Sequence, residues 1–138
     1  MNKPASLRAA ILAAVPALVA TPDAMLISIS AGAVVSTGAR SASFDYEYDC
    51  EVNLWATAAD IDNVTIALLE WIRLNEPAIV ANPDLWRTGF TFYANLLADD
   101  RVNLDIKLKL SESVMVSVGA DGKRVIQYVI DADSPWLP

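Results

Sequence analysis

Of all the side chains in the sequence, four carboxylates at alternate positions come closest to forming a chemical site. Asp45, Glu47, Asp49 and Glu51 lie within the run SFDYEYDCEVNLW. Carboxylate oxygens bind divalent cations, so a metal site is one interpretation. Residues two apart on a strand are about 6–7 Å apart, however, and no turn in the run would make the carboxylates converge. A solvated acidic face is the favoured interpretation.

The amino-acid composition excludes most other kinds of catalytic and metal-binding site. The chain has no histidine, which excludes histidine-based acid–base catalysis, Ser–His–Asp triads and histidine metal sites. The single cysteine, Cys50, excludes an internal disulfide or a multi-cysteine zinc site, and its place among apolar residues predicts a buried thiol. We expect no enzyme and no cofactor. An aspartate-based hydrolase is the enzymatic alternative.

One long strand over residues 43–55 must position the four acids. The alternate positions of the run are apolar and predict a second face that is covered: Phe44, Tyr46, Tyr48, Cys50, Val52 and Leu54. Such a strand would span roughly 43 Å, so we expect it to bend at a bulge or project as an arm. We expect its aromatic residues to pack against a helix over 61–72 and a strand over 90–96. Replacing a buried Phe44 by Ala would then cost about 3–5 kcal/mol.

Length and composition indicate a single domain over residues 1–138. Of the 138 residues 54% are hydrophobic and 20% charged, which argues against disorder and leaves apolar surface for a partner. The net charge of −7 disfavours a general nucleic-acid binder. The apolar run 9–20 is too short to span a bilayer at ~20 residues per helix, and we expect no membrane partner.

The first half of the chain predicts two helices and a hairpin. Leu7, Ala10, Ile11 and Ala14 recur at helical spacing, and a second helix runs from about Thr57 or Asp60 to residue 75. Between them, a strand over 25–34 pairs antiparallel with the acidic strand. The hairpin tip carries Arg40.

The second half predicts further strands, at 89–97, 102–111, 114–118 and 124–130. Lys107 and Lys109 are the natural cross-strand partners of the acids. The fold class is therefore α+β, with a mostly antiparallel or mixed sheet of about five to six strands and two main helices. We predict contact residues at Arg40, at Trp86 and Arg87 before the third strand, and at Trp136 in an extended tail over 131–138.

Several spaced blocks resemble the phage tail completion protein R family of peduovirus-type phages and prophages. They are KPASLRAAILAAVPALVATPDAMLISISAG, TGARSASFDYEYDCEVNLW, LLEWIRLNEPAIVANPD and FTFYANLLADDRVNLDIKLKLSESV, in order from residue 2 to about 118. The end, GADGKRVIQYVIDADSPWLP, offers little to match.

This resemblance implies a structural virion protein with a tail-terminator-like fold. Such a protein would form a homo-oligomeric, usually six-fold, ring at the head-proximal end of a contractile tail, capping the tube or sheath and preparing head–tail joining. Its partners would be tail tube or sheath protein and head–tail connector proteins, with DNA only as passing cargo. It would assemble in the host cytoplasm. A tail assembly chaperone, or a small protein-binding module absent from the mature particle, is the alternative.

The acidic face has two interpretations within such a ring. The carboxylates could line the lumen, where like charge would keep DNA from adhering to the wall. The alternative interpretation is that they pair with Lys107 and Lys109 and face ordinary solvent.

Overall fold

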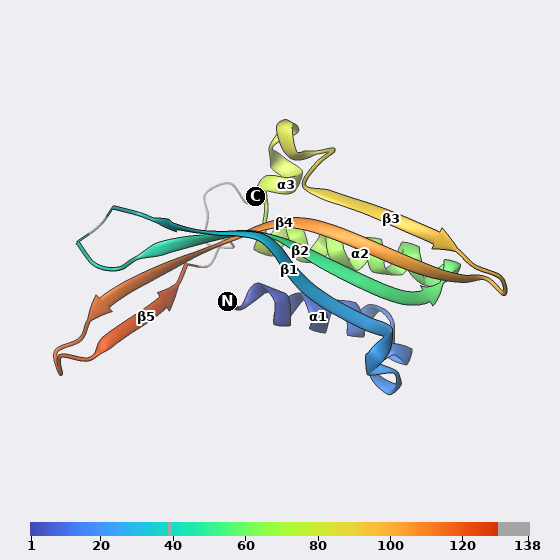
Figure 1. The fold of residues 1–138 in the computed structure, drawn as a ribbon, viewed down its shortest axis with the longest axis horizontal. Coiled ribbons are helices and arrows are strands. Elements are labelled where there is room, and N and C mark those ends of the chain that lie inside the picture. Colours follow the sequence, from blue (N-terminus) through green and yellow to red (C-terminus); the bar gives the residue numbers. More distant parts are fainter. Residues whose placement is uncertain (39, 130–138) are drawn as a thin grey trace.

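The computed structural model describes residues 1–38 and 40–129 as one antiparallel sheet with helices packed on one face. The strands are β1 (Met25–Ser36), β2 (Phe44–Thr57), β3 (Phe90–Leu96), β4 (Arg101–Val118) and β5 (Arg124–Tyr128). Their order is β1-β2-β4-β3, and β5 also pairs with β4 (Figure 1). This confirms the predicted α+β class, with five strands among the described residues.

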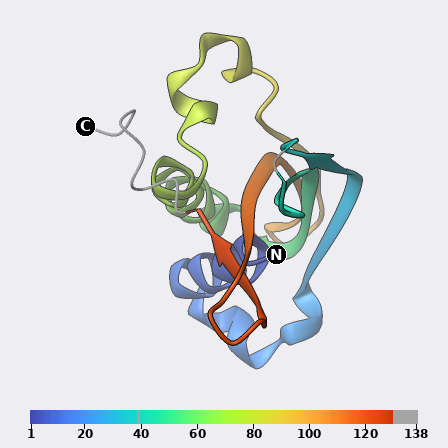
Figure 2. The same ribbon diagram turned by 90° about the vertical axis from the view of Figure 1, so that its left-hand side faces the viewer.

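The helices cover the face of the sheet to which the alternate apolar residues of the strands point. The helical segments are α1 (Lys3–Ala14), α2 (Ala58–Asn75), the short α3 (Ala78–Ala81), and single 3-10 turns at Pro16–Ala20, Pro22–Ala24 and Pro83–Leu85. Figure 2 shows α1 and α2 together on one side of the strands. Within the described residues, no helix covers the opposite face of the sheet.

Local sequence explains where α1 and α2 begin and what they bury. Pro4 occupies the first turn of α1, where a missing N–H costs nothing. Thr57 and Asp60 form a reciprocal capping box at the start of α2. The apolar stripes of both helices are buried as predicted: Leu7, Ile11, Val64, Leu68, Trp71 and Ile72.

The central ladder joins β2 to β4 over the whole length of β2, from Phe44 opposite Val114 to Thr57 opposite Arg101. The predicted strands 102–111 and 114–118 are one continuous strand, so the expected break between them is wrong. β4 is longer than any single neighbour. β3 pairs with its first half, from Leu96 opposite Val102 to Phe90 opposite Leu108. β5 pairs with its end.

The far half of the sheet projects as an arm beyond the helices (Figure 1). We define the arm as residues 33–38, 40–47 and 113–128, which contain the β1–β2 tip and the β4–β5 hairpin. The long acidic strand therefore projects as an arm, which was one of the two alternatives predicted from the sequence. The bulge lies in β1 instead: one extra residue follows Ser30, and Ala31 has a φ of 50°. The Asp-Gly turn of the β4–β5 hairpin is confirmed, with Gly122 at φ 78°.

The predicted packing of the aromatic residues of β2 on β3 is wrong, whereas Tyr48 does belong to the buried cluster that includes Val64 and Leu68 of α2. β3 ends its pairing at Leu108, whereas Tyr48, Tyr46 and Phe44 lie opposite residues 110–114 of β4. They are beyond the end of β3 and cannot pack on it. Tyr48 is buried, but Phe44 is only half-buried in the arm, where its ring meets that of Tyr46 edge-on at 4.9 Å.

The structure therefore predicts a gradient of stability along β2. Leu54→Ala removes a fully buried side chain and should cost about 2–5 kcal/mol of unfolding free energy. Phe44→Ala removes the ring contact with Tyr46 and a side chain that is only half-buried, and should cost about 1–2 kcal/mol of unfolding free energy. Urea unfolding of the two variants measures both values. A larger loss from Phe44→Ala than from Leu54→Ala would contradict this assignment of core and arm.

Candidate functional site

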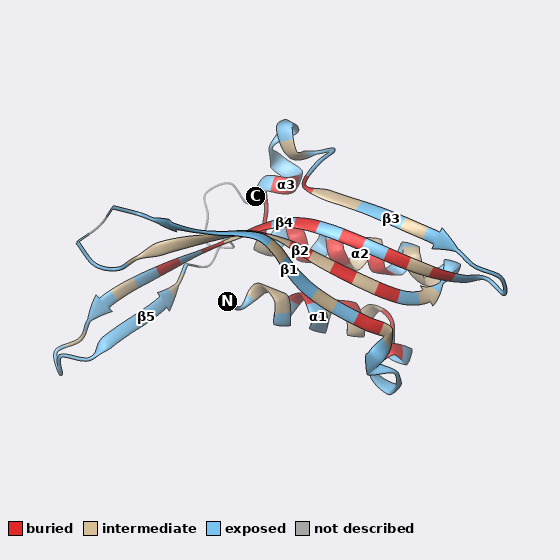
Figure 3. Cartoon of the chain, viewed as in Figure 1, coloured by how far each residue is buried: buried red, intermediate tan, exposed pale blue. Residues whose placement is uncertain are grey.

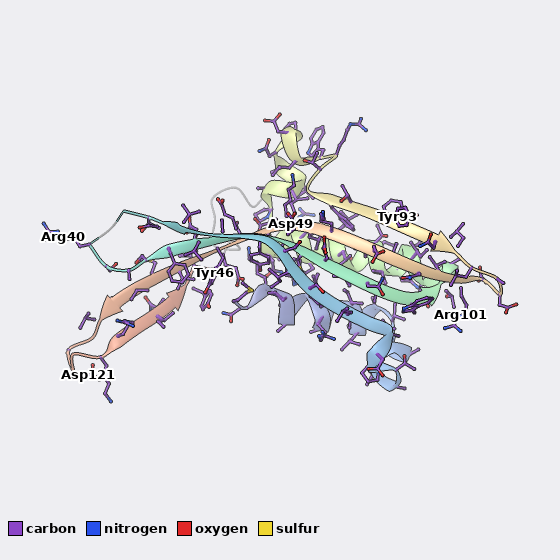
Figure 4. The ribbon with its side chains drawn as sticks, viewed as in Figure 1. Arg40, Tyr46, Asp49, Tyr93, Arg101 and Asp121 are labelled. Carbon is purple, nitrogen blue, oxygen red and sulfur yellow. The ribbon has the colours of Figure 1, made fainter. Side chains whose placement is uncertain are left out.

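The four predicted acids lie on the uncovered face of the sheet. Asp45, Asp49 and Glu51 are half-buried and Glu47 is exposed. Figure 4 labels Asp49 near the middle of the sheet. The register places Asp49 opposite Lys109 and Glu51 opposite Lys107, as predicted. The Lys107 ammonium lies 3.6 Å from a Glu51 carboxylate oxygen.

This face has the character of a contact surface with mixed charges. Among the described residues, no group of three or more potential metal ligands is assembled. Both side chains of the Glu51–Lys107 pair are about half exposed (45% and 46%), so the pair contributes little stability but favours this register. Apolar side chains accompany the charges on the same face, namely Leu26, Val35, Trp55 and Tyr93.

The arm exposes apolar side chains on three of its strands, β1, β4 and β5. Figure 3 shows the hairpins of the arm as largely exposed, in contrast to the buried residues over the helices. The large apolar residues exposed in the arm are Val34, Val35, Met115, Val118, Val125 and Ile126. Two-stranded hairpins have little stability of their own in water, and apolar patches of this kind mark contacts with other proteins.

A third surface is an apolar groove of about 500 Å³ between α2, α3 and β3. It is lined on the helical side by Leu69, Val80 and Trp86 and on the sheet side by Phe92 and Ile106. Phe92 lies on the face of the sheet that the helices cover, yet it is 71% exposed, because β3 is an edge strand that α2 does not fully cover.

The four predicted contact residues do not form one site. Arg40 is exposed at the tip of the arm (Figure 4). Trp86 and Arg87 are exposed at the end of the α3 region, and Trp86 lines the groove while its indole N–H donates to the Val80 carbonyl at 2.8 Å. Trp136 lies outside the described residues.

Glu112 is a buried carboxylate that sequence reasoning missed. Its oxygens accept hydrogen bonds from the Asn2 and Lys3 backbone N–H groups, at 2.6 and 3.1 Å, and from the Tyr48 hydroxyl at 2.8 Å. Two of these donors belong to the first turn of α1, where a negative charge is also favoured by the helix dipole. Burial, reinforced by the bond to Glu112, raises the pKa of Tyr48 above its ordinary value.

Glu76 is a second buried carboxylate, at the C-terminal end of α2. It accepts from the Lys3 ammonium at 2.5 Å and from the Ser111 backbone N–H and hydroxyl at 3.1 and 2.8 Å. Ser111 lies between the parts of β4 that pair with β3 and with β5. The Glu76 carboxylate therefore replaces a strand as acceptor at this point and ties both helices to the sheet.

The sequence did contain a signal for Glu112. Leu104, Ile106, Leu108 and Leu110 alternate on the inner parity of β4, and Glu112 continues that parity before Val114. Because the predicted strand ended at residue 111, Glu112 was not recognised as a carboxylate at a core position. Cys50, by contrast, is buried as predicted, and burial raises the pKa of its thiol to about 11.

Comparison with known proteins agrees with a structural role. Residues 1–132 match the family model of P2 phage tail completion protein R (GpR). The tail completion protein R of Escherichia phage P2 is 34% identical over 135 residues, which cover 98% of this chain and 86% of that protein. No solved structure gave a significant match. Among the described residues, no helix combines the length and apolar character needed to cross a bilayer.

The chain is thus a structural component of a phage tail and not an enzyme. It belongs to the P2 phage tail completion protein R family, which confirms the resemblance seen in the sequence.

The buried carboxylates give a prediction for stability. Glu112→Ala leaves the Tyr48 hydroxyl and the first N–H groups of α1 without their acceptor, at about 1–3 kcal/mol for each group that stays buried. Glu112→Gln keeps an acceptor oxygen for the N–H groups and should be milder. Thermal unfolding of both variants measures the difference. Equal stability of Glu112→Ala and the parent would contradict the role of this carboxylate.

Proposed function

We propose that the chain completes the head-proximal end of a contractile tail as a ring of identical subunits, most simply six. The ring stops polymerisation of the tube or sheath and presents the surface to which the head connector binds. The protein then acts in the virion, after assembly in the host cytoplasm. Membership of the tail completion family supports the assembly role, and the shape of the subunit supports the ring.

The apolar arm is the observation that carries this proposal. A monomer gains nothing from exposing Val118 and Ile126 on a projecting hairpin, because such surface favours burial in water. An arm that reaches onto the next subunit buries these residues in a head-to-tail contact. Contacts of that type close into rings when the rotation between subunits divides a full turn.

The bare face of the sheet is assigned to a second role in the same ring. We propose that Asp45, Glu47, Asp49 and Glu51 face the lumen through which DNA passes. Their row of negative charge, repeated around a ring, repels the phosphate backbone and keeps the duplex from adhering. Lys107 and Lys109 reduce the net charge of each subunit's face, so the effect depends on the number of copies.

The arm is tested by Val118→Asp, with Val118→Ile as the matched control. The position is 74% exposed, and surface substitutions usually change stability by less than ~0.5 kcal/mol. The Asp variant should melt like the parent but fail to restore infectious particles to a phage that lacks the gene, leaving unjoined tails and heads. The Ile variant should restore them.

Two results would contradict the proposal. Full complementation by a folded Val118→Asp variant would remove the arm from assembly. Absence of the protein from purified mature particles would identify it as an assembly chaperone instead.

The lumen assignment is tested by replacing all four acids with their amides. Particles should still assemble, but they should eject DNA slowly or retain it at low salt, where phosphate contacts are strongest. Ejection kinetics at two salt concentrations are the measurement. Unchanged ejection at low salt would mean that the acids only pair with lysines and face solvent.

A further inference from the structure

The apolar groove between α2, α3 and β3 has the size of a binding site. Its volume of about 500 Å³ falls in the range of ~300–1,000 Å³ that is typical of ligand pockets. Leu69, Trp86 and Phe92 present exposed apolar side chains to it, and Asp62 is the one charged residue among the described residues that line it. Such a lining favours an occupant that brings apolar side chains together with a positive charge.

The β4–β5 hairpin of the arm presents a face of this complementary kind. Val118 lies opposite Arg124, and Val116 lies opposite Ile126. Residues that are directly opposite in an antiparallel pair share a face, as do alternate residues along a strand, so these four side chains lie on one face of the hairpin. Val118 and Ile126 are 74% and 60% exposed. The hairpin therefore exposes apolar side chains next to a guanidinium group.

We propose that the groove receives this face of the hairpin from the neighbouring subunit of the ring. Val118 and Ile126 pack on the apolar lining, and the Arg124 guanidinium lies beside the Asp62 carboxylate. Apolar burial supplies most of the affinity, and the charge pair fixes the orientation of the hairpin in the groove. The inference rests on the proposed ring and identifies the surface that the arm contacts.

The hairpin cannot fill the groove of its own subunit. Val116 lies ten positions after Ile106, a lining residue, which corresponds to about 33 Å along β4 at ~3.3 Å per residue. β4 is paired with β2 as far as Val114 and with β5 from there to Val118, so folding the arm back would break these ladders. In Figure 1 the hairpin extends to the left and β3 to the right. Occupying both surfaces requires a head-to-tail contact, in which every copy inserts one hairpin and receives another.

The distribution of charge favours a second copy of the chain as the occupant. The net charge of −7 makes two copies repel each other unless their contact brings opposite charges together. Residues 113–128 contain two bases, Lys123 and Arg124, and one acid, Asp121. This hairpin is thus a basic part of an acidic chain, and the groove offers it Asp62.

Exchanging the two charges tests the orientation of the hairpin. Arg124→Glu alone, or Asp62→Arg alone, places like charges together in every contact of the ring. Both positions are exposed, so neither substitution should shift the melting temperature appreciably. In a phage that lacks the gene, each single variant should give about tenfold fewer infectious particles than the parent, or fewer still. The combined variant should restore the yield, and a combined variant no better than the single ones would contradict the pairing.

Disulfide trapping in purified particles tests the contact itself. Leu69→Cys combined with Ile126→Cys places one thiol in the groove and one on the hairpin, and a disulfide requires Cα atoms within about 7 Å. We expect mild oxidation to give a ladder of linked copies, with the bond between positions 69 and 126 identified by mass spectrometry. The matched control combines Ile126→Cys with Leu26→Cys, an exposed apolar position on the bare face, and should give no ladder.

The remaining outcomes overturn the inference in distinguishable ways. If the particles contain the protein but the bond between positions 69 and 126 does not exceed the control, the groove binds another partner and the ring proposal is untouched. A bond within one subunit would also refute the contact between neighbours. Absence of the protein from purified particles would instead overturn the proposed function, and this inference with it.

Discussion

Two buried carboxylates set the arrangement of the helices on the sheet. A carboxylate that is removed from water is costly unless it accepts hydrogen bonds, and here the donors come from several elements. Glu112 of β4 is met by the first turn of α1 and by the Tyr48 hydroxyl. Glu76 at the end of α2 is met by Lys3 and by Ser111 of β4. Lys3 contributes to both, so α1, α2 and the central ladder are fixed together at one point. Shifting any one of them would leave a buried charge without its partners.

That fixed point divides the sheet into a core half and an arm. On one side, helices cover residues such as Leu54 and Leu108, which are fully buried. On the other side, the strands continue without helices over them and expose residues such as Val118 and Ile126. A subunit with a rigid, covered half and an apolar extension is suited to repeat contacts with copies of itself. The same division leaves the acidic face bare over both halves.

Much of this fold follows from alternation and helical spacing in the sequence. The Thr57–Asp60 cap, the buried parity from Tyr48 to Leu54 and the pairing of Glu51 with Lys107 were all predictable from local patterns. The half-burial of Phe44 was not, because it depends on where β3 ends along β4, a matter of register between distant segments. Glu112 was misread because a carboxylate on an apolar parity looks like the end of a strand. Its donors come from residues 2 and 3, more than a hundred positions away, and no local pattern indicates them.

Imaging of the head–tail junction in intact particles is the most direct test of the proposed ring. We predict a single ring of this chain between the last tail ring and the head connector, with each arm on the neighbouring subunit. Density at that position that the subunit cannot fit, or a junction from which the chain is absent, would contradict it.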